Sequence, residues 1–272
     1  MEGQLFHVFR NTPFGREMFL QSLYTCSKLG LAASVLVPKH KQYLMYFEHQ
    51  VVTLELDDSF LTSPQTAKHR AGELARQFGV EATWLEPKEF TASGLPDLPV
   101  EFDMITCPRS MSEKSTKIGL GHLGPKVRTL VRNSICPVLI PSETYKTWNS
   151  VVVMFGGSDF SKRALEIGSR IARRSGKELS VFSYLENKTE EFYRKRLQST
   201  ALWPEVETGK VRHLTAGGDL VEALWHVPHD ALVVAGAYGH GIVREVIFGS
   251  MIEHFQTRLP NNLVLIGPNC RA

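Results

Sequence analysis

The order of strands and helices repeats along this sequence, and the repeat constrains the fold more than any other feature. Apolar runs at 5–9 and 31–37 predict strands, and apolar residues at helical spacing over 14–29 predict a helix between them. Strands predicted at 151–155 and 179–183 flank a second such helix. Because strands that alternate with helices form parallel sheets, each half should be an α/β, Rossmann-like domain with a doubly wound parallel sheet.

The two halves also end alike, each with an apolar run that reaches a proline, at 136–141 and 263–268. A chain of 272 residues is long enough for two domains of about 100–150 residues. We therefore predict a tandem duplication, with domains at 1–142 and 149–272. Two extended runs within 43–56 predict a hairpin inserted into the first domain.

Composition excludes several classes of function. The formal net charge is +3, and the 31 basic residues are spread along the chain, so we expect no nucleic-acid partner. No apolar stretch approaches the roughly 18–20 residues that cross a bilayer, and we expect a cytoplasmic protein without a membrane span. The four cysteines lack the spacing of a metal or redox motif, so they should be reduced thiols, and we expect no metal site in the protein.

A glycine-rich segment follows the strand predicted at 231–235. Its glycines and serine have the spacing G-2X-G-9X-G-S, from Gly236 and Gly239 to Gly249 and Ser250. Glycines at a strand end permit close approach of a ligand, and a helix that opens at Ser250 would direct free N–H groups at an anion such as a phosphate. The alternative is that Ser250 and Glu253 form a capping box and the glycines only turn the chain. The residues alone leave both open.

The segment 230–250, followed by the strand at 263–266, resembles the closing half of a universal stress protein domain. The segment 151–158, followed by Arg163-Ala164-Leu165, resembles the opening of that domain. The resemblance implies a tandem universal stress protein: a cytoplasmic, non-catalytic regulator of the stress response that binds ATP, ADP or AMP, with Mg²⁺ as a companion ion. It also implies a regulatory protein partner. Whether two chains associate is left open by the sequence, and a homodimer is the default expectation.

The resemblance implies a nucleotide site in the second domain. The phosphates would contact Gly236, Gly239, His240, Gly241, Gly249, Ser250 and Met251. The adenine would face the end of the second strand, near Tyr184. Gly156 stands where the family usually has an aspartate that contacts the nucleoside, which weakens the expected site.

The first half departs further from the family pattern. Arg10 takes the aspartate position, Cys107 and Pro108 replace the first motif glycine, and Pro125 stands where the family has serine. Proline removes an N–H that a phosphate would use, so we predict a degenerate, structural copy. The G-x-G-x-x-G pattern at 119–124 follows a polar segment instead of an apolar strand, which disfavours a dinucleotide fingerprint.

Two other functions remain as alternatives to nucleotide-dependent regulation. The loss of aspartate at Gly156 favours a scaffold that has given up nucleotide and acts through protein contacts. Slow ATP hydrolysis is the weaker alternative, because the sequence offers no nucleophile elbow, zinc motif or evident general base.

Overall fold

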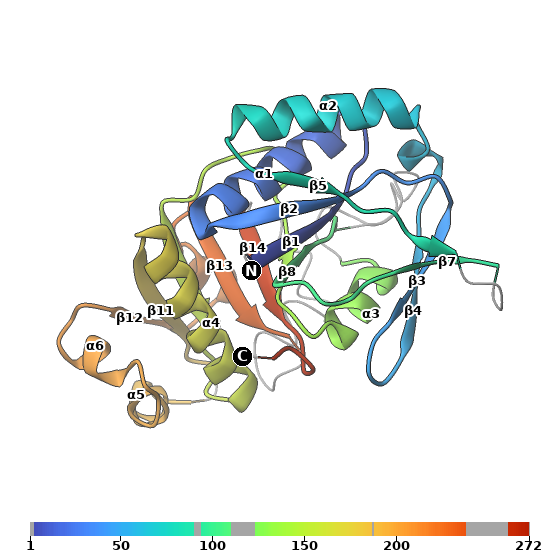
Figure 1. Cartoon of the computed structure of the whole chain (residues 1–272). Coiled ribbons are helices and arrows are strands. Elements are labelled where there is room, and N and C mark those ends of the chain that lie inside the picture. The colour runs from blue at the N-terminus through green and yellow to red at the C-terminus, as the bar shows by residue number, and fades with distance from the viewer. Residues whose placement is uncertain (1–2, 90–93, 110–122, 187, 238–260, 272) are drawn as a thin grey trace. The chain divides into compact units, whose positions relative to one another are not determined.

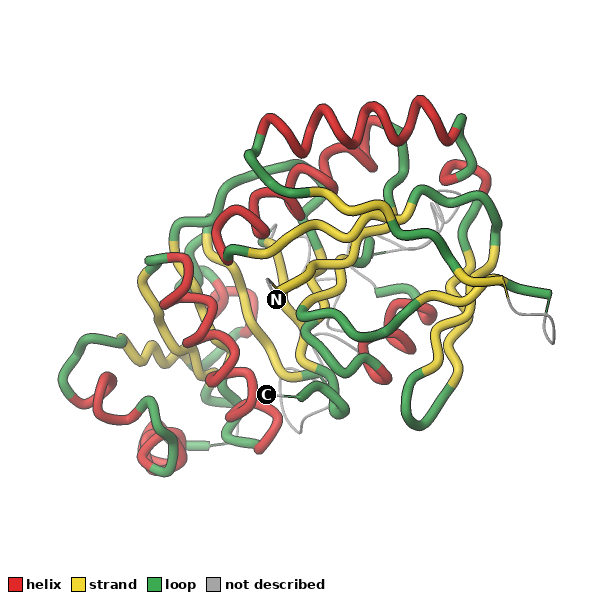
Figure 2. The backbone as a smooth tube through the Cα atoms, in the orientation of Figure 1, coloured by secondary structure: helices red, strands yellow, loops and turns green. Residues whose placement is uncertain are grey.

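The computed structural model describes residues 3–89, 94–109, 123–186, 188–237 and 261–271. These residues form two compact units. The first unit comprises the described residues up to 109 together with 124–147 and 269–271. The second unit is formed chiefly by the described part of 148–268. Both units contain helices and strands (Figure 2).

The second unit contains a parallel sheet. Its described strands are β10 (Ser150–Met154), β11 (Glu178–Tyr184), β12 (Arg212–Ala216), β13 (Ala231–Gly236) and β14 (Asn262–Ile266). They lie in the order β12-β11-β10-β13-β14, and every neighbouring pair is parallel. All residues of β13 and β14 are buried, as is typical of apolar strands in a parallel sheet. The order confirms the doubly wound topology predicted for this half.

Helix α4 (Asp159–Ser175) packs on this sheet through Ala164, Ile167 and Ile171, as its apolar spacing predicts. The contact is close, because a Cβ added to Gly168 would lie 2.4 Å from the Val153 Cγ2 atom. The remaining helices of the unit are α5 (Glu190–Gln198), α6 (Trp203–Glu207) and α7 (Leu220–Leu224). We did not predict α6, because five residues are too few to show a helical period.

The first unit contains a similar parallel sheet. Its strands are β1 (Gly3–Val8), β2 (Leu31–Leu36), β5 (Ala82–Trp84), β8 (Met104–Thr106) and β9 (Val138–Ile140), in the order β9-β8-β1-β2-β5. Helix α1 (Pro13–Leu29) packs on β1 and β2, and α2 (Pro64–Gln77) lies beside α1 (Figure 1). Helix α3 (Pro125–Asn133) begins after Gly124, as predicted. Ser63 precedes α2 as predicted, but its side chain makes no capping hydrogen bond to the helix backbone.

The predicted inserted hairpin is present, and it belongs to a second, smaller sheet. Strands β3 (Gln42–Tyr46) and β4 (Val51–Glu55) pair antiparallel. The Pro, Gly, Ser and Thr residues over 87–99 predict a plain loop. That prediction is wrong, because this segment holds β6 (Lys88–Glu89) and β7 (Pro96–Leu98). Strand β7 pairs with β3 and gives the sheet order β4-β3-β7-β6. Strands this short owe their existence to long-range pairing, which the local Pro, Gly and Ser residues do not reveal.

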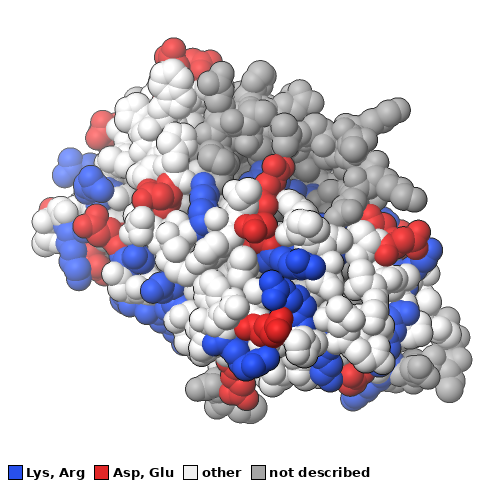
Figure 3. All heavy atoms as spheres, turned by 90° about the horizontal axis from the view of Figure 1, so that it is seen from above, with Lys and Arg blue, Asp and Glu red and all other residues white. Residues whose placement is uncertain are grey.

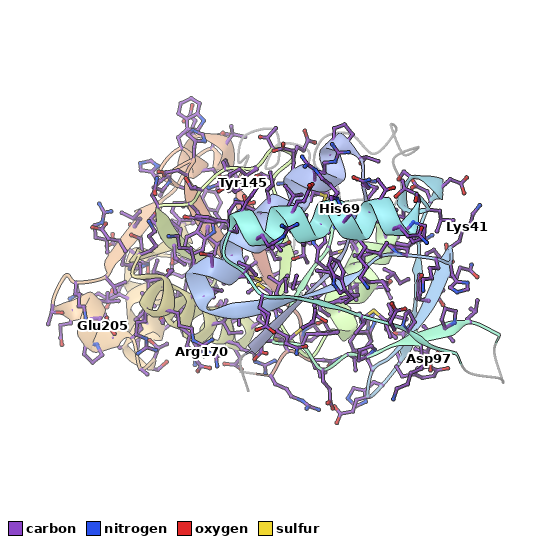
Figure 4. The ribbon with its side chains drawn as sticks, turned by 45° about the horizontal axis from the view of Figure 1, so that its top comes forward. Lys41, His69, Asp97, Tyr145, Arg170 and Glu205 are labelled. Carbon is purple, nitrogen blue, oxygen red and sulfur yellow. The ribbon has the colours of Figure 1, made fainter. Side chains whose placement is uncertain are left out.

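The segment predicted as a linker, 142–149, is anchored on the first unit up to Thr147. The Tyr145 ring, labelled in Figure 4, packs edge-on against Tyr24 and Phe78, with ring centroids 6.2 and 5.8 Å away. The Tyr145 amide donates to the Glu17 Oε2 atom at 2.7 Å. This part of the connection is therefore packed against the helices of the first unit.

Candidate nucleotide site

The second unit has a topological switch point between β10 and β13. From β10 the chain passes through α4 to β11 on one side, and β13 is the neighbour on the other side. In doubly wound sheets, ligands bind in the crevice at the carboxyl ends of the two strands that flank such a point. This strand order therefore marks the place where a ligand of this unit would bind.

Three of the residues predicted from the sequence lie at this edge. Gly156 follows β10, Tyr184 ends β11 and Gly236 ends β13. The register aligns Met154 with Phe182 and with Ala235, so the three strands end together. The structure thus brings Gly156, Tyr184 and Gly236 to one edge of the sheet, around the switch point.

The other predicted phosphate contacts lie outside the described residues. These are Gly239, His240, Gly241, Gly249, Ser250 and Met251. The helix predicted over 250–259 falls in the same segment. Their role therefore remains a prediction.

The turn after β10 contains two consecutive glycines, so no side chain covers its backbone. Gly156 is half-buried, and Gly157 has a φ of +76°, a conformation that side chains with a Cβ rarely adopt. Ser158 then caps α4, because its Oγ accepts the Ser161 amide at 3.3 Å. The first turn of a helix leaves backbone N–H groups without intrahelical partners, and α4 presents this end at the switch point. The residues Gly156-Gly157-Ser158-Asp159 predict a turn and a helix start, and α4 begins at Asp159 as this pattern predicts.

Gly236 has a packing role that the sequence did not reveal. A Cβ at this position would lie 2.7 Å from the Phe160 carbonyl oxygen, which belongs to the first turn of α4. Real Cβ atoms do not approach backbone oxygens this closely. A glycine is therefore required here for close contact between β13 and α4, whether or not a ligand binds beside it.

Tyr184 is fixed by a hydrogen bond to the turn between β12 and α7. Its hydroxyl donates to the Gly218 carbonyl oxygen at 2.5 Å, and Gly218 itself has a φ of +83°. Burial raises the Tyr184 pKa, and the negative charges of Glu186 and Asp219 raise it further. The ring is thus held at the sheet edge by a neutral hydroxyl.

A buried polar chain lies behind the switch point, and sequence analysis missed it. Ser183 donates to the Phe155 carbonyl oxygen at 2.9 Å, and the His213 Nε2 atom lies 3.0 Å from the Ser183 Oγ. Because the Ser183 hydroxyl proton is donated to the Phe155 carbonyl oxygen, the Ser183 Oγ accepts a hydrogen bond from His213. The His213 Nε2 atom therefore carries the ring proton. Burial lowers the His213 pKa, against the opposing charge of Glu190. Ser183 has no exposed surface, so this Ser–His pair is structural.

The switch point of the first unit lies between β1 and β8, and Arg10 fills it. The Arg10 side chain is only 3% exposed, and its Cζ lies 4.8 Å from the centre of the Phe60 ring and 5.1 Å from that of Phe14. Its Nη1 is 3.4 Å from the Ser59 Oγ. Cys107, after β8, is fully buried, and this burial raises the pKa of its thiol. Side chains of the protein thus occupy this crevice.

No group of three or more His, Cys, Asp or Glu residues within the described chain is arranged to hold a metal ion. All four cysteines are free and buried. No described helix combines the length and apolar character that a bilayer crossing requires. Figure 3 shows positive and negative side chains interspersed on the face that it presents.

Solved structures with the same fold identify the architecture. A universal stress protein from Archaeoglobus fulgidus DSM 4304 matches with a TM-score of 0.60 and 15% sequence identity, over 97% of this chain and 96% of that chain. A functionally unknown protein from Pseudomonas aeruginosa PAO1 matches with a TM-score of 0.56 and 14% identity, over 98% and 93%. The cytoplasmic domain of a prokaryotic cation chloride cotransporter matches with a TM-score of 0.51 and 10% sequence identity, over 97% of this chain and 95% of that chain.

No protein-family model matches the sequence, and no curated protein matches it. The structural match nevertheless extends over nearly the whole chain. The chain therefore has the α/β fold of a universal stress protein, as the resemblance of its sequence predicted.

Proposed function

We propose that this chain is a tandem universal stress protein whose second unit binds an adenine nucleotide, ATP, ADP or AMP, at the switch point between β10 and β13. Occupancy of that site would regulate contact with a protein partner or with a second copy of the chain under stress. No chemical step belongs to this role. The pair of Ser183 and His213 supports a wall of the site, because Ser183 is fully buried.

The observation that carries the proposal is the convergence of Gly156, Tyr184 and Gly236 at one edge of the sheet. The glycines leave the backbone open to close approach, and the first turn of α4 offers N–H groups and a positive dipole end. Both suit a phosphate. The G-2X-G-9X-G-S spacing that starts at Gly236 supports the same ligand.

A companion Mg²⁺ would enter with the phosphates. The described residues provide no cluster of acidic side chains for it, and Mg²⁺ usually keeps several water ligands and binds substrate phosphates. We therefore expect Mg²⁺ to raise ATP affinity and to show no binding to the protein alone.

Two measurements test the proposal. Freshly purified protein is denatured, and the supernatant is analysed for released adenine nucleotide. The protein freed of nucleotide is then titrated with ATP by calorimetry. We expect one or both signals in the wild type, and a lower affinity in Ser250→Ala but not in the matched control Ser175→Ala. The proposal is refuted if no nucleotide is released and millimolar ATP gives no heat.

The alternative is a scaffold that acts through protein contacts without nucleotide. Two observations favour it: Gly156 lacks the carboxylate that the family uses, and a similar fold occurs in the cytoplasmic domain of a cotransporter. If this alternative holds, partner binding in a pull-down assay will be unchanged by ATP. Under the nucleotide proposal, ATP will change the amount of partner that is captured.

A further inference from the structure

A groove of about 330 Å³ lies on the second unit, and its lining does not include Gly156, Tyr184 or Gly236. One wall is a stripe of α4 that contains Lys162, Glu166 and Arg173. The other wall is formed by residues 199–202, which join α5 to α6, and by Glu205 of α6. Figure 4 labels one residue from each wall, Arg170 on α4 and Glu205 on α6. A groove of this size holds a small molecule.

The α4 wall presents positive charge that no neighbour neutralises. Arg170 and Arg173 are exposed, and within the described chain neither makes an ion pair. They are three residues apart on the helix, so their side chains emerge as neighbours. Lys162 pairs only with Asp159, at 3.6 Å, and the Asp159 side chain is 96% exposed, so that pair is weak. Two guanidinium groups side by side suit a phosphate, which each can contact through two N–H groups.

A serine hydroxyl that lines the same groove has no partner within the described chain. Ser169 is 9% exposed and lines the groove between the arginines and Glu166. Its hydroxyl makes no hydrogen bond within the described chain. The Ser169 Oγ still reaches solvent, so it can donate to a ligand oxygen that enters the groove.

Two carboxylates in the lining indicate the rest of the ligand. Glu166 lies four residues from both Lys162 and Arg170, yet it makes no ion pair among the described residues. Glu205, on the opposite wall, lies 3.4 Å from Lys210. Carboxylates accept hydrogen bonds from hydroxyl groups, and a ligand that was only an anion would be repelled by them.

We propose that this groove binds a small phosphorylated polyol or sugar. Its phosphate would lie on Arg170, Arg173 and the Ser169 hydroxyl, and its hydroxyl groups would donate to Glu166 and Glu205. The site is independent of the nucleotide proposed at the switch point.

The probe for this site is glycerol 3-phosphate, with glycerol and inorganic phosphate as the two partial ligands. We expect glycerol 3-phosphate to bind more tightly than phosphate, and glycerol to give no signal. The double variant Arg170→Gln/Arg173→Gln should lose about a hundredfold in affinity, because it removes two charge-assisted hydrogen bonds and each accounts for roughly tenfold. Ser169→Ala should lose less. Arg174→Gln removes the next positive charge on α4 from outside the groove and should change nothing.

The Nε–Hε signals of Arg170 and Arg173 in nuclear magnetic resonance spectra give a readout that needs no variant, and both should shift on addition of glycerol 3-phosphate. The proposal is overturned if wild type shows neither heat nor a shift, or if Arg174→Gln loses as much affinity as the double variant. It is also overturned if phosphate binds as tightly as glycerol 3-phosphate. ATP titrations of the double variant separate the two sites, since the switch-point proposal predicts that ATP still binds.

Discussion

In the first unit the chain that leaves β1 places Arg10 at the switch point, whereas in the second unit the chain that leaves β10 places Gly156 there. The Arg10 guanidinium is buried over the rings of Phe14 and Phe60. Gly156 has no side chain and is half-buried. The same strand order thus has a buried arginine at the switch point of one unit and a glycine at that of the other.

The inserted hairpin explains how the first unit can bury a charged side chain. A short 3-10 turn, η1 (Asp58–Phe60), follows the hairpin, and it supplies both Phe60 and Ser59 to Arg10. A buried guanidinium needs aromatic faces and hydrogen-bond acceptors in place of water. The second unit has no such insertion between β11 and α5, where only 185–189 intervene. Burial of Arg10 in the first unit therefore depends on the residues that follow the inserted hairpin.

The largest effect should come from adding a methyl group at Gly15, in the first turn of α1. Its Cβ would lie 2.0 Å from the Arg10 carbonyl oxygen, so the backbone beside the filled switch point would have to move. We expect Gly15→Ala to lower the free energy of unfolding by about 3 kcal/mol or more. Urea denaturation followed by circular dichroism measures this.

The corresponding change in the second unit is Gly236→Ala, where the Cβ would lie 2.7 Å from the Phe160 carbonyl oxygen. We expect a smaller loss, of about 2 kcal/mol. Gly72→Ala in α2 is the control, because its Cβ meets only the Trp84 ring, at an ordinary 3.6 Å. That variant should gain up to about 1 kcal/mol from helix propensity. Equal losses for all three variants would contradict the proposed close contacts.

The next effect tests the filling of the first crevice. Arg10→Ala removes the contacts with Phe14 and Phe60 and leaves a cavity, so the free energy of unfolding should fall by about 2 kcal/mol. Arg10→Met keeps much of the volume without the charge and should cost less, because a buried charge gains little net stability. If Arg10→Ala is as stable as wild type, Arg10 does not fill a packed crevice.

Local signals account for what could be predicted of this fold. Helix α1 has Pro13 in its first turn and is capped at its C-terminus by Gly30, which has a φ of +62°. A proline at a helix start and a glycine at a helix end can both be recognised in the sequence. The order of elements also predicts that the glycine-rich turns at Gly156 and Gly236 follow strands, whereas Tyr184 was expected at the same edge from the family resemblance. By contrast, the pairing of β7 with β3 joins segments about fifty residues apart, and no local pattern marks it.

The same limit applies to the site. The departure at Arg10 was visible in the sequence, but its partner Phe60 was not, because only tertiary packing brings them together. The bond from Tyr184 to Gly218 and the chain from His213 to Phe155 likewise join separate strands and turns. The packing reason for Gly236 needed the position of α4. The sequence therefore predicts which residues lie at the candidate site, but not which residues they contact in the folded chain.

A third prediction concerns two histidines, one in each unit, that contact a buried serine. The His7 Nδ1 atom lies 2.9 Å from the Ser22 Oγ, which lies 2.9 Å from the Thr106 Oγ1. Burial, assisted by the charge of Arg10, lowers the His7 pKa from 6.5 to about 3. Below pH 6.5 the unfolded chain therefore binds a proton that the folded chain does not bind. This contribution should lower stability as pH falls from about 6.5 towards 3, by about 2 kcal/mol at pH 5.

Urea unfolding at pH 7 and pH 5 measures this loss, and His7→Gln should remove the part that His7 contributes. His213 is less buried than His7, and the charge of Glu190 opposes the lowering of its pKa by burial. Its contribution to the pH dependence of stability should therefore be smaller than that of His7. In ring-proton titrations of the folded protein, His213 should protonate below its ordinary range, and His7 should remain neutral down to pH 5. Protonation of His7 near pH 6.5 in the folded protein would contradict its burial.

The smallest predicted effect bears most directly on the difference between the two crevices. Gly156→Asp returns the carboxylate that the family pattern has at this position, and Gly156 lacks the positive φ of Gly157, so an aspartate fits the backbone. A hydrogen bond to a charged group contributes at least about 1.5 kcal/mol, so ATP affinity should rise about tenfold in calorimetry. Gly156→Ala adds a Cβ without the carboxylate and should not gain.

Arg10→Asp makes the same replacement in the first unit, and we expect no second ATP site there. Cys107 is buried after β8, and Pro125 opens α3 without the N–H that a phosphate would use. A stoichiometry of two in Arg10→Asp would show that one side chain closes the first crevice. A stoichiometry of one would show that the first unit has also lost the residues that would bind the phosphates. If wild type and Gly156→Asp bind ATP equally, the carboxylate is not what separates this chain from the family pattern, and the main motive for a nucleotide-free scaffold disappears.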